Sequence, residues 1–178
     1  LPSGYEVANS CRFDNASNSS LSKTYSGDGN MKTWTVSMWV KLADLGRDQY
    51  FFGCGNGSSI GNYFQWDSND NIRIYSYTSG MQWNLITNAK YRDISAWYHV
   101  VVRMDNTQGT ETDRLRLYVN GTQVTSFGTS NYPSQNTDYY INDATYPHYI
   151  SMGALGAYVA EVFFCDGQSY AATSFGEF

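Results

Sequence analysis

The chain has 178 residues, enough to bury a substantial hydrophobic core, and we expect a single domain over residues 1–178. Aromatic residues make up 17% of the chain, with 16 tyrosines, whereas charged residues make up only 15%, so Asn, Ser, Thr, Gly and Tyr must carry much of the surface. The formal net charge of −5 argues against a nucleic-acid partner, and no apolar run approaches the length of a bilayer span, so we expect no membrane insertion.

The first half of the chain contains short runs in which apolar and polar residues alternate, a pattern typical of strands with one buried face. In one of them Ile72 and Ile74 share one face, while Arg73, Tyr75 and Tyr77 share the other. Segments rich in glycine and asparagine separate the runs and indicate turns. We expect strands over 5–13, 21–25, 34–42, 50–55, 63–67, 72–77 and 83–87.

The middle of the chain predicts three consecutive antiparallel strands, and the rest of the fold is organised around them. Apolar residues share one parity in the first two of these strands. Asn120-Gly121 then forms the strongest short-range hairpin signal, because a type I′ turn needs positive φ at both central residues. The three strands are expected over 96–105, 114–119 and 122–125.

A long polar segment, 126–146, follows the central strands, and a segment of this length is usually functional or carries a short strand of its own. Two closing strands are expected over 148–153 and 157–165. The chain therefore predicts roughly ten to twelve short strands and no convincing helix. This pattern indicates an all-β fold, a two-sheet antiparallel β-sandwich of the jelly-roll type.

The chain has three cysteines, Cys11, Cys54 and Cys165. An odd number leaves at least one thiol free or paired between chains, and we expect all three to be reduced and mostly buried. No Cys-x-x-Cys or His/Cys cluster is present, which argues against zinc. His99, within a predicted strand, is expected to be structural.

Four segments, 32–41 (KTWTVSMWVK), 96–101 (AWYHVV), 117–121 (LYVNG) and 160–168 (AEVFFCDGQ), resemble strands of concanavalin A-like, laminin-G-like jelly rolls and occur in the order of that family. Further segments resemble a variant abundant in tailed bacteriophages: 4–10, 12–13, 85–87, 91–93 and 174–177. The resemblance implies a virion surface protein, and thus an extracellular location, as a tail fibre, a spike or a capsid decoration. The three cysteines do not belong to the pattern.

Carbohydrate binding is the leading functional hypothesis, because sugars stack on exposed aromatic rings and form hydrogen bonds with polar side chains. The alternative is that the same aromatic surfaces bind other virion subunits, with a homo-oligomer such as a trimer among the expected assemblies. The candidate ligand-binding residues are Trp66, Tyr75, Tyr77, Trp83, Tyr139, Tyr140 and Tyr146.

Calcium is the one ion that the resemblance implies, since many relatives hold Ca²⁺ in a rim loop through carboxylate, amide and backbone oxygens. Asp67, Asn69 and Asp70 are the candidate ligands, with Asp28 and Asn30 as an alternative pair. The competing interpretation is that these residues only form turns. No other cofactor is expected.

Catalysis is not expected. Glycoside hydrolases of this fold need two carboxylates beside the scissile bond, about 5 Å apart in retaining enzymes. None of the four glutamates lies in the E-x-D-x-E spacing used by the glucanases of this fold. The glutamates are Glu6, Glu111, Glu161 and Glu177. A glycoside hydrolase is therefore the least favoured alternative.

Overall fold

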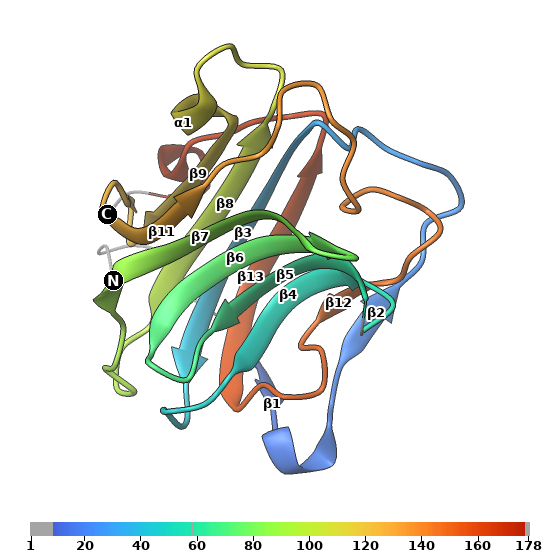
Figure 1. Cartoon of the computed structure of the whole chain (residues 1–178). Coiled ribbons are helices and arrows are strands. Elements are labelled where there is room, and N and C mark those ends of the chain that lie inside the picture. The colour runs from blue at the N-terminus through green and yellow to red at the C-terminus, as the bar shows by residue number, and fades with distance from the viewer. Residues whose placement is uncertain (1–8, 58, 177–178) are drawn as a thin grey trace.

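The computed structural model describes residues 9–57 and 59–176, and its strands form two antiparallel sheets that face each other (Figure 1). The first sheet has six strands in the order β1-β13-β3-β8-β9-β10. Their bounds are β1 (Cys11–Phe13), β13 (Ala157–Asp166), β3 (Thr33–Leu42), β8 (Tyr98–Asp105), β9 (Leu115–Val119) and β10 (Thr122–Gln123).

The second sheet has seven strands in the order β11-β7-β6-β5-β4-β12-β2. Their bounds are β11 (Phe127–Asn131), β7 (Met81–Lys90), β6 (Asn71–Thr78), β5 (Ile60–Trp66), β4 (Gln49–Gly55), β12 (His148–Ile150) and β2 (Leu21–Lys23). Strands distant in sequence lie side by side in both sheets, as the pairing of β13 with β3 and of β12 with β4 shows. The predicted all-β jelly-roll sandwich is confirmed.

Helical structure in the described residues is limited to three single turns, α1 (Glu111–Arg114), η1 (Asn15–Ser17) and η2 (Ala172–Phe175). The absence of helix-forming periodicity in the sequence accounts for this. Among these residues no helix combines the length and the apolar character that a membrane span requires.

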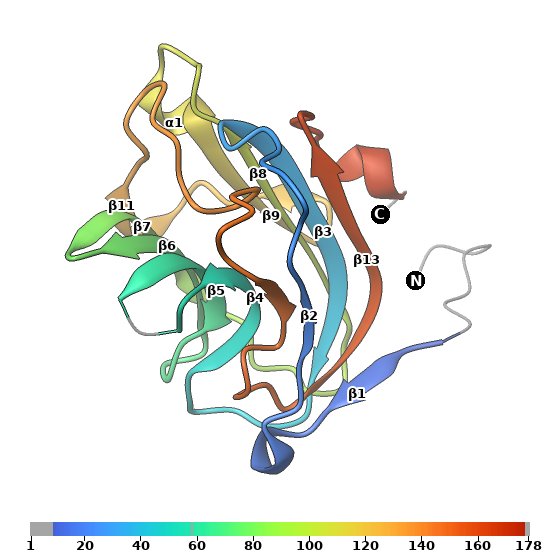
Figure 2. The same cartoon turned by 90° about the vertical axis from the view of Figure 1, so that its right-hand side faces the viewer.

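The core lies between the two sheets, where the inward residues of both sheets meet (Figure 2). In β3 the alternation places Trp34, Val36 and Met38 inward, and each is at most 1% exposed. Phe64 of β5 faces Trp34 with ring centroids 6.1 Å apart. Packing of this kind is the main source of stability in a sandwich, because each large aromatic side chain removes extensive apolar surface from water.

The central hairpin forms as the sequence predicts. β8 pairs with β9 in the register Val100↔Val119 and Met104↔Leu115, and β10 returns along β9. Asn120 has φ 49° and Gly121 has φ 78°, the left-handed conformations that the turn requires. The segment 126–146 does carry a short strand, one of the two possibilities for a segment of this length: β11 forms an edge of the seven-stranded sheet.

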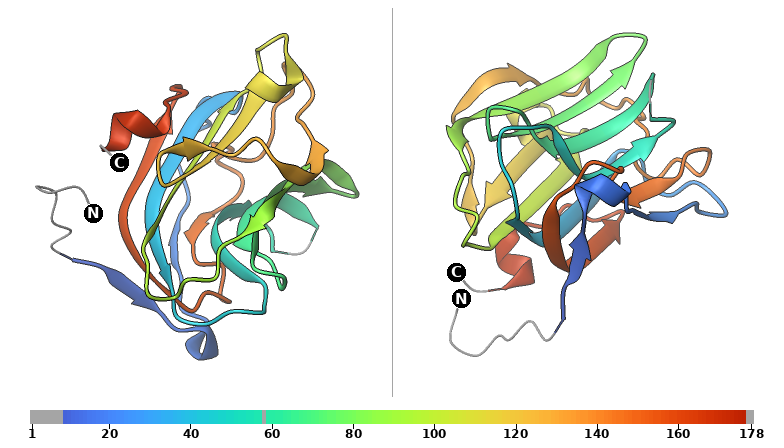
Figure 3. Two further views of the ribbon diagram at one scale, coloured as in Figure 1. Left: turned by 90° about the vertical axis from the view of Figure 1, so that its left-hand side faces the viewer. Right: turned by 90° about the horizontal axis from the view of Figure 1, so that it is seen from below.

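The outer face of the six-stranded sheet is covered by the chain that follows β13 (Figure 3). Thr35 Oγ1 donates to the Gln168 carbonyl and accepts from Tyr170 N–H, and Ala172 packs on the buried Val101. Beneath this segment Ser37 Oγ lies 2.8 Å from His99 Nε2. Burial lowers the pKa of His99 to about 4, so this histidine is neutral and structural at pH 7, as expected.

The cysteines differ from one another in exposure. Cys54 is buried, Cys165 is half-buried and Cys11 is exposed, and all three are free thiols. Burial raises the pKa of the Cys54 thiol to about 12. The prediction of a buried thiol is therefore wrong for Cys11, because β1 is an edge strand. The first part of the opening strand predicted over 5–13 lies outside the described residues, and β1 begins at Cys11.

Candidate functional site

A pocket of about 400 Å³ opens on the outer face of the seven-stranded sheet. Side chains from β4, β5, β6 and β7 line it, together with residues that follow β4 and β12. Its size falls within the range of small-ligand sites. The lining residues are Tyr50, Gly57, Tyr63, Arg73, Tyr75, Tyr77, Met81 and Met152.

Strand alternation and register together produce the aromatic part of the pocket. Tyr63 of β5 and Tyr75 of β6 are directly paired across the two strands, and their ring centroids lie 5.1 Å apart. Tyr50 of β4 meets the Tyr63 ring edge-on at 6.0 Å. A bulge between Tyr50 and Phe52 shifts the register of β4 against β5 and brings Tyr50 to the same face.

Arg73 is the charged residue of the pocket lining. Its guanidinium carbon lies 4.2 Å from the centre of the Tyr75 ring, within the range of a cation–π contact. Its Nε donates a hydrogen bond of 3.0 Å to Oδ1 of Asn84 in β7. These two contacts hold the side chain against the sheet, and the lining residues within 9–57 and 59–176 include no carboxylate.

Met152 forms one wall of the pocket because Gly53 of β4 has no side chain. A Cβ atom at position 53 would lie 2.6 Å from the Met152 Sδ and 2.7 Å from the Asn62 carbonyl oxygen. The glycine therefore lets the Met152 side chain lie on the outer face of β4. The thioether adds a flexible apolar surface to the tyrosine rings.

Two tyrosines of the pocket, Tyr63 and Tyr75, are neutral phenols at physiological pH. Burial raises the pKa of Tyr75, and a hydrogen bond with Tyr50 raises it further. Burial likewise raises the pKa of Tyr63, whose hydroxyl donates to the Ile60 carbonyl at 3.0 Å. Each ring thus offers an apolar face, and the Tyr63 hydroxyl, whose proton goes to Ile60, can still accept a hydrogen bond.

Two of the predicted ligand-binding residues, Tyr75 and Tyr77, lie in this pocket. Three others do not reach the surface: Trp66 and Trp83 are at most 1% exposed and Tyr139 is 5% exposed. Trp83 meets Tyr139 edge-on at 6.0 Å within the core. The prediction that these three bind a ligand is corrected, because their rings are used to fill the space between the sheets.

Tyr140 and Tyr146 form a separate half-buried pair. Their rings meet edge-on at 5.5 Å, and the Tyr140 hydroxyl shares a hydrogen bond with Thr78 Oγ1 at the end of β6. Asn62 Oδ1 accepts from the Tyr140 backbone N–H at 2.8 Å. Neither tyrosine lines the pocket, so the structure does not join them to Tyr75 and Tyr77.

Sequence reasoning missed Tyr50, Tyr63, Met81 and Met152 as lining residues. Arg73 was placed on the face of Tyr75 and Tyr77 by parity, but it was not assigned to a site. Parity could therefore have added Arg73 to the candidates. The other four depend on pairing between strands, which alternation within one strand does not reveal.

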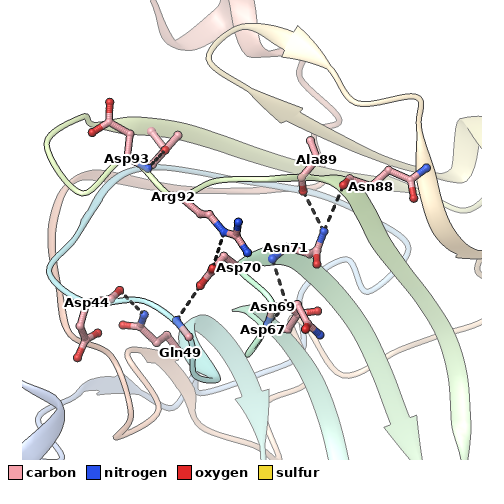
Figure 4. A network of polar contacts seen from close by, with 12 residues as sticks. Asp44, Gln49, Asp67, Asn69, Asp70, Asn71, Asn88, Ala89, Arg92 and Asp93 are labelled. Carbon is pink, nitrogen blue, oxygen red and sulfur yellow. Dashed lines mark hydrogen bonds and ion pairs between the residues drawn. The ribbon is translucent and has the colours of Figure 1, made fainter.

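The predicted calcium ligands form an internally bonded turn (Figure 4). Asp70 Oδ1 accepts from Gly46 N–H at 2.7 Å and its Oδ2 accepts from Arg92 Nε at 2.8 Å. Asp67 Oδ1 accepts the backbone N–H of Asn69 and of Asn71. Burial alone would raise the pKa of Asp70, but the bonds from Gly46 and Arg92 outweigh it and lower the pKa.

The alternative calcium pair is bonded in a similar way. Asp28 Oδ1 accepts from Ala144 N–H at 2.8 Å, and Asn30 Oδ1 accepts from the backbone of Lys32 and Thr33. Within residues 9–57 and 59–176, no three His, Cys, Asp or Glu side chains gather as a metal site would require. The prediction that Asp67, Asn69 and Asp70 bind calcium is therefore corrected: both oxygens of Asp70 already bind protein donors, so these side chains stabilise the turn.

The two glutamates within the described residues lie on separate elements. Glu111 belongs to α1, which precedes β9, and Glu161 lies at an irregularity of β13 with φ 50°. Neither lines the pocket. Glu6 and Glu177 lie outside the described residues.

Comparison with known families gives a match over most of the chain. The family described as the concanavalin A-like lectin/glucanases superfamily matches residues 14–151. No curated protein matches the chain in sequence.

Several solved structures are similar to the chain. The CBM40 domain of Ruminococcus gnavus IT-sialidase aligns with a TM-score of 0.59 and 13% identity, over 88% of this chain and 99% of that chain. Domain 4 of AbnA, a GH43 extracellular arabinanase from Geobacillus stearothermophilus, in complex with arabinotriose, has a TM-score of 0.56 and 16% identity, over 81% and 66%. Domains LG4-5 of the mouse laminin α1 chain align with a TM-score of 0.58 and 14% identity, over 92% of this chain and 43% of that chain. At these identities the likeness shows the shared fold.

Proposed function

Because the chain belongs to the concanavalin A-like lectin/glucanases superfamily, we propose that it is a non-catalytic module that binds carbohydrate in the pocket lined by tyrosines and Arg73. The observation that carries the proposal is the pocket itself: four tyrosines on the outer face of the seven-stranded sheet surround a space of about 400 Å³. Hereafter this space is called the tyrosine pocket.

The chemistry of the lining suits a sugar. The C–H face of a pyranose ring packs on a tyrosine ring, while its hydroxyls need donors and acceptors placed around that ring. Tyr63 and Tyr75 supply adjacent aromatic surfaces 5.1 Å apart, and the guanidinium of Arg73 supplies donors beside them. Because neighbouring strands hold these side chains, the site is largely formed before a ligand arrives.

Two of the similar structures support the proposal by what they bind. The CBM40 domain of the Ruminococcus gnavus enzyme was solved bound to α2,3-sialyllactose, and AbnA domain 4 was solved with arabinotriose. Their folds match this chain at 12% and 16% identity. They thus support a carbohydrate ligand as a class, and the tyrosine pocket is our assignment of the place.

The absence of carboxylates from the pocket lining supports the non-catalytic part of the proposal. Most glycoside hydrolases use a pair of carboxyl groups flanking the bond that breaks. The lining residues are tyrosines, methionines, one arginine and a glycine. The lining residues that the structure describes therefore offer no carboxyl pair of this kind.

The test is a glycan array followed by titration calorimetry on each ligand found. We expect Tyr77→Ala to weaken binding, because Tyr77 lines the pocket. Tyr158→Ala is the matched control, since Tyr158 is a half-buried tyrosine of β13 in the other sheet. Absence of binding across the array, or equal loss with both variants, would contradict the proposal. Release of reducing sugar from a bound glycan would favour a hydrolase instead.

A second proposal concerns location: we propose that the module is displayed on the surface of a tailed-bacteriophage virion and also contacts other virion subunits. It is supported by the sequence resemblance and by an aromatic group on the outer face of the six-stranded sheet. Phe163 is 45% exposed and Tyr170 is 41% exposed, and both rings lie about 6 Å from Phe175. Such a group fits a protein interface, including one between copies in a trimer.

Purified particles provide the test of location. Mass spectrometry and immunogold labelling should find the protein in the particles, and Phe163→Ser should weaken its attachment while leaving glycan binding unchanged. If the protein were instead found free in a cellular secretome, the virion proposal would be wrong.

A further inference from the structure

We infer that the tyrosine pocket selects sugars that carry an anionic group, a carboxylate or a sulfate, and that Arg73 binds this group. The inference rests on the proposed function, because it takes the pocket as a sugar site and adds the class of sugar. It follows from the charge of the lining and from the bonds that Arg73 makes.

Arg73 has no carboxylate partner in the described part of the chain. The four ion pairs found there involve other cations, Lys32, Arg47, Arg92 and Arg116. Arg73 instead donates through Nε to the neutral side chain of Asn84 and lies over the Tyr75 ring. It is therefore a half-buried cation whose charge is not balanced by a nearby anion of this sheet.

The carboxylate of Asp48 is bonded to the strand partner of Arg73 and not to Arg73 itself. Gln65 of β5 is the direct partner of Arg73 in β6, and its Nε2 donates to Asp48 Oδ1 at 3.2 Å. The same Oδ1 accepts from Ser68 N–H at 3.0 Å. Asp48 thus serves to hold Gln65 and the β5–β6 turn, and it forms no ion pair with Arg73 within 4 Å.

The contacts of Arg73 leave the two Nη atoms of its guanidinium available to an anion. Because the hydrogen bond from Arg73 to Asn84 uses Nε, the N–H groups of both Nη atoms remain for a ligand. Two parallel donors of this kind match the two oxygens of a carboxylate or sulfate. The aromatic surroundings lower the local dielectric constant and so strengthen such a contact.

The preference for an anionic sugar must come from the pocket itself, because the chain as a whole is negatively charged. The net charge of −5 repels acidic polymers in general, so an acidic glycan gains nothing from the protein surface as a whole. Binding of an acidic sugar should consequently depend on one cation, and salt should weaken it only as far as one charge pair allows.

The experiment compares acidic glycans with their neutral counterparts by calorimetry. The pairs are α2,3-sialyllactose with lactose, oligogalacturonate with its carboxyl-reduced form, and a sulfated galactan oligosaccharide with its desulfated form. We expect the acidic member of at least one pair to bind about tenfold or more tightly. The pair that responds also identifies the anion as carboxylate or sulfate.

Variants of Arg73 assign the preference to this residue. Arg73→Gln should abolish the difference between the acidic and neutral sugar, and Arg73→Lys should keep part of it. Arg12→Gln is the matched control, because Arg12 lies over Tyr158, at 5.8 Å from its ring centre, on the other sheet. Thermal melts of each variant show whether it is folded.

The outcomes separate this inference from the proposed function. Equal binding of acidic and neutral sugars, or an acidic preference that survives Arg73→Gln in the folded variant, overturns the role of Arg73 but leaves a carbohydrate site. Failure to bind any of the six sugars, together with an empty glycan array, overturns both.

Discussion

The guanidinium carbon of Arg73 lies 4.2 Å from the centre of the Tyr75 ring. Tyr75 is two residues further along β6, on the same face of the strand. Residues two apart on a strand share a face, so this contact is a direct product of the strand period. Tyr75 also packs on Tyr63 of the neighbouring strand. Tyr75 is therefore the side chain that joins the cation of the tyrosine pocket to its aromatic surface.

Replacement of this ring should weaken sugar binding strongly. Tyr75→Ala removes the surface under Arg73 and beside Tyr63, and we expect a loss of about 1–2 kcal/mol in the free energy of binding, measured by calorimetry. Tyr75→Phe keeps the ring and should lose much less. Wild-type affinity in a folded Tyr75→Ala protein would show that the ligand binds elsewhere.

Replacement of the buried tryptophans should act on stability. Trp66 and Trp83 are at most 1% exposed, so Trp83→Ala should lower the free energy of unfolding in urea by about 3–5 kcal/mol, and Trp66→Ala by a similar amount. Trp83→Phe, which keeps most of the volume, is the milder control. If Trp83→Ala were as stable as the wild type and lost only glycan binding, the buried position of this ring would be refuted.

Asp70 should matter as a charge-assisted hydrogen-bond acceptor. Asp70→Asn weakens the bonds from Gly46 and Arg92, and we expect a loss of about 1–3 kcal/mol in the free energy of unfolding. Because both oxygens of Asp70 already accept hydrogen bonds from Gly46 and Arg92, we expect EDTA to leave the melting temperature of the wild type unchanged. A rise of the melting temperature on adding Ca²⁺ that disappears in Asp70→Asn would instead restore the calcium hypothesis.

The stability of the protein should fall as the pH drops through the range in which histidine titrates. Burial lowers the pKa of His99 from 6.5 to about 4, so between these values the unfolded chain binds a proton that the folded chain does not. Proton binding then stabilises the unfolded state relative to the folded one. The free energy of unfolding falls by on the order of 3 kcal/mol by pH 4 from His99 alone. Urea unfolding at pH 7.0, 5.5 and 4.5 measures it.

A variant separates His99 from the other groups that titrate there. Burial also lowers the pKa of His148, which adds a loss of the same sign. Asp70 contributes below this range, because its lowered pKa makes its stabilisation disappear only as the pH falls through the folded value. His99→Gln should therefore flatten the curve between pH 6.5 and 4 without removing it. An unchanged slope would show that His99 is not the neutral, buried base described here.

Prediction from the sequence succeeded where a local rule applies. Asn120 and Gly121 form the turn expected of them, since the required positive φ values depend on these two residues alone. Prediction failed where a side chain contacts a residue distant in the sequence. The Asp67–Asp70 turn suggested a metal site, but the cation that occupies Asp70 is Arg92, 22 residues further along the chain.

The alternation of apolar and polar residues by itself determined the strands, the sandwich and the common face of Arg73, Tyr75 and Tyr77, because side-chain direction along a strand has a period of two. Only the tertiary structure decided which aromatic rings meet water. In β5 both parities carry aromatic residues, with Tyr63 on one and Trp66 on the other, so alternation cannot say which faces the core. That choice depends on the second sheet, which covers Trp66 and leaves Tyr63 beside Tyr75 in the tyrosine pocket.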